Sequence, residues 1–157
     1  MRNILMVCTA NICRSPMAQI VAAQTIERRG LARAIRVDSA GTNASKGAAQ
    51  PDSRARTALH KRGYVVGKGK SRRVEVQDFE RFDLILAMDR TNLKSLQALC
   101  PPEHQVKVRM FLESAGPAGR DEVPDPYYGN ADGFERVLDL CEAGIGYWLA
   151  DATLVRA

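Results

Sequence analysis

The sequence has 157 residues, of which 45% are hydrophobic and 26% charged, and its formal net charge is +5. This length and composition predict one globular domain over residues 1–157 and exclude a disordered or collagen-like chain. No apolar run approaches the ~18 residues of a membrane span, and the N-terminal apolar run is too short for a signal-peptide core. We therefore expect a cytoplasmic protein without membrane insertion.

The chain opens with a strand pattern and then a helix pattern. Residues 4–7 form a short unbroken run of strand-forming apolar residues, which is typical of a strand buried on both faces. A helix is predicted over residues 16–29, with Ser15 as its N-cap, Pro16 at its first position and Gly30 as its stop. A loop that ends at Ser15 therefore joins the two elements.

The next predicted elements are short. Residues 35–38 alternate as a strand, and the small residues 39–42 predict a turn. Residues 43–51 are small, polar and glycine-containing, which is typical of a loop. Asp52 is a good N-cap for the helix that follows, and Gly63 closes that helix.

The second half of the chain continues the alternation. Residues 82–88 are a largely apolar run of the buried parallel kind, and a leucine-containing helix follows that ends at the prolines 101–102. Residues 106–110 alternate, which predicts an edge strand with one exposed face. A loop rich in glycine and proline covers residues 114–129, and a long amphipathic helix capped by Asp132 ends the chain.

Strands that alternate with helices predict an α/β fold with a parallel, doubly wound sheet. We expect a single-domain three-layer α/β/α structure with about four parallel strands in flavodoxin-like order. In such sheets ligands bind beyond the carboxyl ends of the strands, which is where Cys8 would lie. The glycine-rich motifs of dinucleotide and nucleoside triphosphate sites are absent from the sequence.

Residues 7–15 carry the pattern that points most directly to chemistry. The first N–H groups of a helix lack intrahelical partners and favour an anion, and a thiol placed there ionises more easily than a free thiol. Cys8 is therefore a candidate nucleophile, although a lone cysteine after a strand can also be a small core residue. Arg14 adds a planar fork of donors that matches two phosphate oxygens. The predicted phosphate-binding residues are Thr9, Ala10, Asn11, Ile12, Cys13, Arg14 and Ser15.

The string Val-Cys-Thr-Ala-Asn-Ile-Cys-Arg-Ser-Pro closely resembles the signature of the low-molecular-weight protein tyrosine phosphatases, Cys-x-Gly-Asn-x-Cys-Arg-Ser-Pro. Residues 38–42, the pair Asp52 and Arg54, and residues 86–89 also look like family landmarks, so the resemblance covers nearly the whole chain. One departure is Ala10, which stands where the family usually has glycine. We expect Ala10 to adopt a negative φ angle, because alanine at positive φ would be strained.

A thiolate that attacks a phosphate ester needs an acid to protonate the leaving oxygen. Asp125 lies in the string Val-Pro-Asp-Pro-Tyr-Tyr-Gly, which resembles the family's Asp-Pro-aromatic-x-Gly loop, whose aspartate is the general acid. The resemblance implies that Tyr127 and Tyr128 form a wall beside the substrate ring. Near Ser45 this chain lacks an aromatic residue that relatives often carry, so Ser45 is expected to leave one side of the cleft open.

The resemblance implies a phosphatase that hydrolyses protein phosphotyrosine and aryl phosphates through a cysteinyl-phosphate. Cys8 would be the nucleophile, Arg14 would hold the phosphoryl oxygens, and Asp125 would act as general acid and base. Ser15 would donate a hydrogen bond to the Cys8 sulfur, and Asn11 would brace the loop. No metal or cofactor is expected. The substrate would be a phosphotyrosine-containing protein, with a bacterial-type tyrosine kinase as one candidate.

The four cysteines are expected to be reduced, and their spacing does not suit a zinc site. Because Cys13 lies beside a reactive thiolate, and because the family resemblance implies it, we expect a reversible Cys8–Cys13 disulfide under oxidants. The basic run at residues 68–73 is interpreted as a solvated loop and not as a nucleic-acid surface, since only Tyr64 interleaves with the nearby charges.

Two other functions share the cradle. An arsenate reductase of the same fold would need further cysteines to relay oxidation, and Cys100 and Cys141 do not have a paired appearance in the sequence. A non-catalytic phosphoprotein-binding module would have no use for Asp125. Both alternatives are therefore less favoured than the phosphatase.

Overall fold

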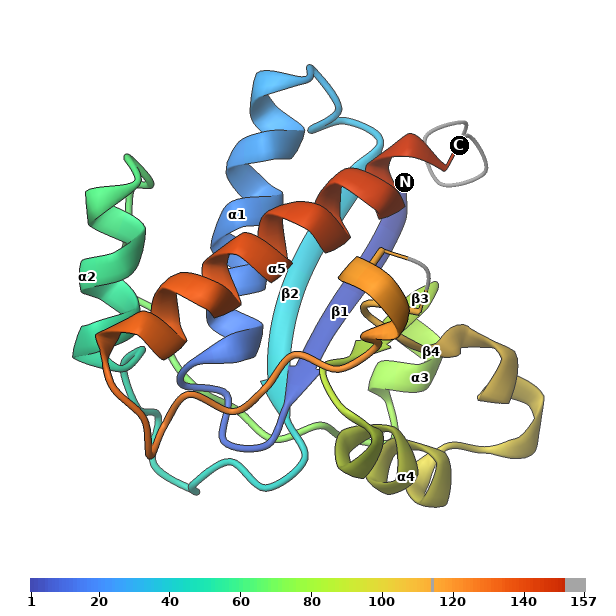
Figure 1. Cartoon of the computed structure of the whole chain (residues 1–157). Coiled ribbons are helices and arrows are strands. Elements are labelled where there is room, and N and C mark those ends of the chain that lie inside the picture. The colour runs from blue at the N-terminus through green and yellow to red at the C-terminus, as the bar shows by residue number, and fades with distance from the viewer. Residues whose placement is uncertain (114, 152–157) are drawn as a thin grey trace.

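The structure, a computed structural model, describes residues 1–113 and 115–151, so Ser114, where the predicted loop begins, and residues 152–157 lie outside the described part. Its centre is one four-stranded sheet in which every neighbouring pair is parallel, with the order β2-β1-β3-β4 (Figure 1). The strands are β1 (Arg2–Cys8), β2 (Ile35–Gly41), β3 (Leu84–Ala87) and β4 (Val108–Met110). The predicted α/β class and parallel sheet are confirmed.

The side chains of β1 pack against helices on both faces of the sheet. Alternate side chains of a strand point to opposite faces, and here Ile4, Met6 and Cys8 join one apolar cluster while Leu5 and Val7 join the other. The first cluster includes side chains from the helices α1 (Arg14–Arg28), α2 (Ser53–Lys61) and α5 (Ala131–Ala150). The second includes side chains from α3 (Asp78–Arg81) and α4 (Arg90–Leu99). The strands therefore lie between two helical layers, as predicted (Figure 1).

Two local predictions about strand ends and turns were wrong, and one helix was not predicted. Residues 39–41, predicted as part of a turn, continue β2 and pair in register with the end of β1. Val106, predicted in the edge strand, lies in the 3₁₀ helix η1 (Pro102–Lys107) and is 82% exposed, so β4 begins only at Val108. Helix α3 was not predicted. The short 3₁₀ helix η2 (Pro117–Gly119) lies in the predicted glycine- and proline-rich loop.

The helix caps confirm one prediction and correct two. The Asp52 side chain accepts a hydrogen bond from the backbone N–H of Arg54 and so caps α2 as predicted. Helix α1 begins at Arg14, before Ser15, and the Ser15 hydroxyl bonds within the preceding loop instead of capping the helix. Asp132 lies inside the first turn of α5, whose N-cap position is Asn130.

Helix α5 offers a matched pair of glycines for a stability test. A Cβ added at Gly144 would lie 2.4 Å from ring atoms of the fully buried Phe111, whereas one added at Gly146 meets no atom within 4 Å. We expect Gly144→Ala to destabilise the protein by roughly 1–3 kcal/mol through overpacking. Gly146→Ala should stabilise it by up to about 1 kcal/mol, because alanine favours the helix more than glycine does.

Urea unfolding followed by tryptophan fluorescence measures this difference, since the indole N–H of Trp148 donates to the Phe111 carbonyl oxygen at 2.8 Å. Equal midpoints for the two variants would show that the ring of Phe111 moves aside without cost.

Within the described residues, no helix combines the length and the apolar character that a membrane crossing requires.

Candidate active site

The loop between β1 and α1 is fixed by backbone hydrogen bonds from the chain after β2. The N–H of Thr42 donates to the Cys8 carbonyl at 2.9 Å, and that of Asn43 to the Thr9 carbonyl at 2.8 Å. Gly41 ends β2 so close to this loop that an added Cβ would lie 2.5 Å from the Thr9 carbonyl oxygen. The small residues in this segment therefore allow close approach of two chain segments.

Backbone strain in the loop falls on Asn11 and not on Ala10. Asn11 has φ 56°, and among the described residues it is the one non-glycine at positive φ. The expectation that Ala10 keeps a negative φ is therefore confirmed. Asparagine tolerates the left-handed region better than most residues, which explains how alanine can occupy the position before it.

The buried side chain of Asn11 links the loop to its surroundings. Its amide nitrogen donates to the hydroxyl of Ser15 at 2.8 Å and to that of Ser39 at 3.0 Å. Its carbonyl oxygen accepts from the backbone N–H of Arg72 at 3.1 Å. The Ser39 hydroxyl in turn donates to Gln19 at 2.6 Å, so each polar atom of the Asn11 side chain has a partner.

The thiol of Cys8 lies at the end of β1, is 3% exposed, and has a hydroxyl beside it. Its sulfur is 3.0 Å from the Ser15 oxygen. Because that oxygen already accepts from Asn11, the Ser15 proton is free to point to the sulfur or to the Ala40 carbonyl, which is 3.3 Å away. A thiolate is the stronger acceptor of the two because it is charged.

Arg14 is almost wholly buried, with 2% of its side chain exposed, and is anchored by several acceptors. Its Nη1 donates to Asp89 at 2.5 Å and to the Val123 carbonyl at 3.1 Å. Its Nη2 lies 3.4 Å from the Thr9 hydroxyl. Asp89 also caps α4, where its other oxygen accepts from the N–H of Asn92 at 2.7 Å.

The role of Asp89 as the partner of Arg14 was not predicted from the sequence. The available signal was its place just beyond the carboxyl end of a buried parallel strand, where ligands and functional side chains gather.

Asp125 reaches the same guanidinium from the other side. Its Oδ2 lies 3.6 Å from Arg14 Nη2, while its Oδ1 accepts from the backbone N–H of Tyr127 at 3.1 Å. The side chain is 48% exposed, so one carboxyl group faces both the arginine and solvent. A pocket of about 650 Å³ opens beside it, lined by Asp89 and by residues 119–125.

The comparison with models of known protein families identifies the family of this chain. The model of the low molecular weight phosphotyrosine protein phosphatases matches residues 3–156. The chain belongs to this family.

Individual phosphatases agree with that assignment. The chain is 42% identical to the low molecular weight phosphotyrosine protein phosphatase of Schizosaccharomyces pombe, over 84% of this chain and 85% of the relative. It is 39% identical to the low molecular weight protein-tyrosine-phosphatase of Streptomyces coelicolor, over 90% and 87%. The crystal structure of a protein tyrosine phosphatase from Entamoeba histolytica superposes with a TM-score of 0.92 at 37% identity, covering 98% of this chain and 97% of that one.

The chain is therefore an enzyme of the protein-tyrosine-phosphatase class, and its substrates are phosphoproteins.

In this phosphatase the predicted substrate wall lies partly in solvent. Tyr127 is 43% exposed and Tyr128 is 94% exposed, and their rings meet edge to face with centroids 5.0 Å apart. The guanidinium of Arg54 lies 5.5 Å from the ring centroid of Tyr127, within the range of a cation–π contact. Ser45 is exposed, next to Ala44, which packs against Gly41.

The second cysteine of the phosphatase loop is chemically different from the first. Burial raises the pKa of the Cys13 thiol to about 12, and the nearby Asp52 carboxylate adds to the rise. Cys13 therefore stays protonated at neutral pH, which makes its thiol slow to react with an oxidant. The disulfide between them stays a prediction.

Proposed function

We propose that this phosphatase hydrolyses phosphotyrosine in proteins through a cysteinyl-phosphate on Cys8, with Arg14 holding the phosphoryl oxygens and Asp125 as general acid and base. The observation that carries the proposal is the convergence of three groups at one loop. The Cys8 sulfur lies 3.0 Å from the Ser15 hydroxyl, and the buried Arg14, which begins α1 at the end of the same loop, lies 3.6 Å from the Asp125 carboxylate.

The reaction has two steps. In the first, the Cys8 thiolate attacks phosphorus in line, the bond from phosphorus to the tyrosine oxygen breaks, and Asp125 gives its proton to that oxygen. In the second, Asp125 takes a proton from water, the water oxygen attacks phosphorus, and the thiolate leaves as inorganic phosphate forms. Arg14 and the backbone N–H groups of residues 9–15 stabilise the charge on the equatorial oxygens in both steps.

The experiment that tests the proposal is hydrolysis of p-nitrophenyl phosphate in the presence of EDTA, with Cys8→Ser as the comparison. Turnover that needs the thiol but no added metal supports a cysteinyl-phosphate mechanism. Turnover that survives in the variant contradicts it.

The arsenate reductase alternative finds little support in the positions of the other cysteines. Cys100 belongs to the apolar cluster on the face of the sheet opposite to the one that contains Cys8. Cys141 is fully buried in α5, and burial raises the pKa of its thiol, which makes it a poor relay for oxidation. A non-catalytic binding module would not need a proton donor, so that alternative does not explain why Asp125 lies beside Arg14.

A bacterial-type tyrosine kinase is our candidate for the phosphoprotein substrate, and a cytoplasmic location stays a prediction. The chemistry of the site favours a phosphorylated aromatic side chain, because Tyr127 and Tyr128 stand beside the acid loop.

The open side of the cleft at Ser45 gives a prediction about substrate affinity. Ser45→Trp should lower KM for aryl phosphates by about 2- to 10-fold, as expected for one added aromatic contact, with little change in kcat. Steady-state kinetics on p-nitrophenyl phosphate measure this, with Ser95→Trp on the exposed side of α4 as the matched control. An unchanged KM in Ser45→Trp would mean that the side chain at position 45 does not face the substrate ring.

A further inference from the structure

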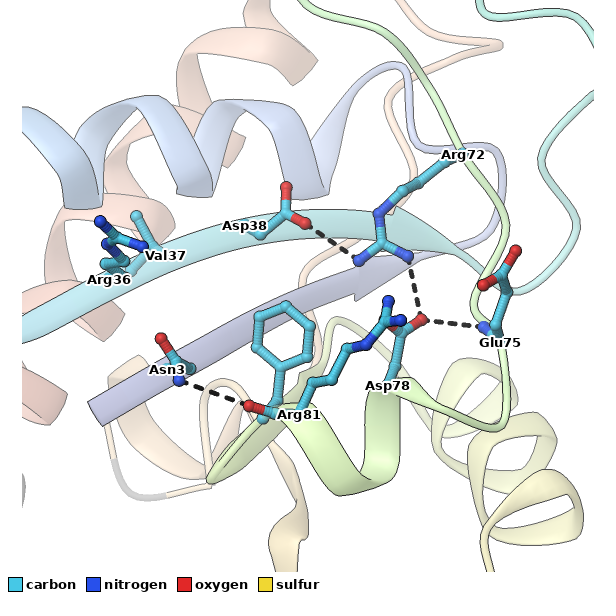
Figure 2. Close-up of a pocket in the computed structure, with 9 residues that line it drawn as sticks. Asn3, Arg36, Val37, Asp38, Arg72, Glu75, Asp78 and Arg81 are labelled. Atoms are coloured by element: carbon cyan, nitrogen blue, oxygen red, sulfur yellow. Dashed lines mark hydrogen bonds and ion pairs between the residues drawn. The ribbon is translucent and has the colours of Figure 1, made fainter. Parts of the chain in front are cut away.

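A pocket of about 470 Å³ lies on the face of the sheet that α3 covers, and Arg72 spans it (Figure 2). The Arg72 guanidinium donates to Asp38 of β2 and to Asp78 at the start of α3, at 2.9 Å in each case. Asp78 is nearly buried, with 2% of its side chain exposed, and also accepts from the backbone N–H of Glu75. The side chain of Arg72 is therefore anchored to two elements at once.

The main chain of the same residue faces the opposite way, toward the phosphate-binding loop. Its N–H donates to the Asn11 side-chain oxygen at 3.1 Å, and its carbonyl accepts from the N–H of Gly41 at 2.9 Å. The N–H of Val74 then donates to the Gly41 carbonyl at 3.0 Å. Residues 72–74 thus extend alongside the end of β2. The Arg72 guanidinium anchors this extension on the side of α3, while the Arg73 guanidinium donates to the Ala44 carbonyl at 2.6 Å.

The Arg72 N–H sets the direction of the hydrogen bonds that reach the nucleophile. Because it occupies the oxygen of the Asn11 amide, the amide nitrogen must face Ser15 and Ser39. The Ser15 oxygen then accepts from Asn11, and its proton is left for the Cys8 sulfur at 3.0 Å or the Ala40 carbonyl at 3.3 Å, of which a thiolate is the stronger acceptor. If the Asn11 amide rotated by half a turn, its oxygen would compete with the sulfur for that proton.

We propose that Arg72 is a positioning residue of the active site: its ion pairs with Asp38 and Asp78 hold its N–H against Asn11, and through Asn11 and Ser15 they keep a hydrogen bond directed at the Cys8 thiolate. This inference rests on the proposed role of Cys8. The guanidinium of Arg72 lies in the pocket beside α3, and Arg72 acts on the loop through Asn11.

The segment before Arg72 explains why a side-chain anchor is needed. Residues 65–70 contain two glycines and form no helix or strand, and Ser71 is held by paired bonds with the backbone of Ala49. Glycine-rich chain has high conformational freedom, so a backbone donor at its end is held in place only if a neighbouring group is fixed. The bonds to Ala49 fix the residue before Arg72, and the two carboxylates fix the side chain of Arg72 itself.

The test compares Arg72→Met with Arg62→Met. Arg62 also bridges carboxylates, those of Glu135 and Asp139, but both of these lie on α5 and not beside the loop. We expect Arg72→Met to lower kcat/KM for p-nitrophenyl phosphate by about tenfold or more, the usual effect of losing a hydrogen bond to a charged group. Arg62→Met should leave kcat/KM within about twofold of the wild type, as expected for exposed ion pairs remote from the chemistry.

The second readout is alkylation of Cys8 by iodoacetamide, a neutral reagent that does not need the anion cradle. At mildly acid pH the rate should fall by about tenfold in Arg72→Met, because the thiolate loses its donor, and it should recover at alkaline pH. Arg72→Lys should restore part of the rate. A damaged fold would also expose Cys13, Cys100 and Cys141, which are buried here, so alkylation confined to Cys8 tells the two causes apart.

A second variant guards against misfolding. Asp38→Asn removes one partly exposed carboxylate and leaves the buried pair of Arg72 with Asp78 in place, so it should fold and show a smaller effect in the same direction. Unchanged alkylation in both Arg72→Met and Asp38→Asn, with Cys8→Ser inactive, overturns the inference but leaves the proposed function standing. An active Cys8→Ser overturns the proposed function itself.

Discussion

Replacing Cys8 by serine is expected to lower hydrolysis of p-nitrophenyl phosphate by about ten-thousandfold or more, the scale seen when an enzyme loses its nucleophile. A serine hydroxyl is far less ionised than a thiol at neutral pH, so the variant lacks the anion that would attack phosphorus. The Ser15 hydroxyl, 3.0 Å from the Cys8 sulfur, can still bond to the new oxygen, so the loop itself should keep its shape. The measurement is steady-state turnover in reducing buffer that contains EDTA.

Cys100→Ser is the matched control for this experiment. Cys100 is also a buried thiol, but it lies in the apolar cluster on the opposite face of the sheet. It should keep wild-type turnover. Loss of activity in both variants would point to a general effect on folding, and turnover that survives in Cys8→Ser would mean that another group attacks the phosphate.

The second large effect is expected at Asp125, and it should depend on the leaving group. Asp125→Asn keeps the shape of the side chain but removes the proton that the leaving oxygen receives. We expect kcat/KM for phenyl phosphate to fall by roughly a hundredfold to ten-thousandfold, the range for loss of a general acid. The fall for p-nitrophenyl phosphate should be clearly smaller, because p-nitrophenolate leaves without protonation.

Asp121→Asn is the control for Asp125→Asn. Asp121 lines the pocket beside Asp125 and forms an ion pair with Arg90. Its replacement removes one negative charge near the site without touching the proposed proton donor, so both substrates should respond alike and weakly. Equal losses on the two substrates in Asp125→Asn would argue that the carboxylate only positions Arg14, from which it lies 3.6 Å.

The strands and the large helices could be predicted because buried parallel strands are apolar throughout and the helices are amphipathic. The wrong predictions concern the ends of the strands β2 and β4. Residues 39–41 have the composition of a turn, yet they continue β2, because a glycine is needed where Gly41 meets the Thr9 carbonyl. Val106 fits an alternating pattern but lies in a 3₁₀ helix that begins at Pro102, and proline favours such a first position.

For the site, the sequence indicated which residue types belong together but not every partner. Cys8 and Arg14 were predicted because they flank one loop, and Asp125 because it lies in a string that resembles a known one. Asp89 and Arg72 reach the loop through pairings between segments that are distant in the chain, at separations of 75 and 61 residues from their partners. No local pattern specifies such pairings.

The burial of Arg14 has a consequence for discrimination among ligands. The guanidinium is anchored by Asp89 and by the Val123 carbonyl, so groups of the protein itself fix its orientation. A preformed cradle binds without the cost of ordering, but it receives the same tetrahedral oxygens from a protein-bound phosphoryl group and from free inorganic phosphate. The cradle therefore supplies affinity that the reaction product shares. We infer that the preference for the substrate over the product comes from the proposed substrate wall, whose aromatic groups are the exposed Tyr127 and Tyr128.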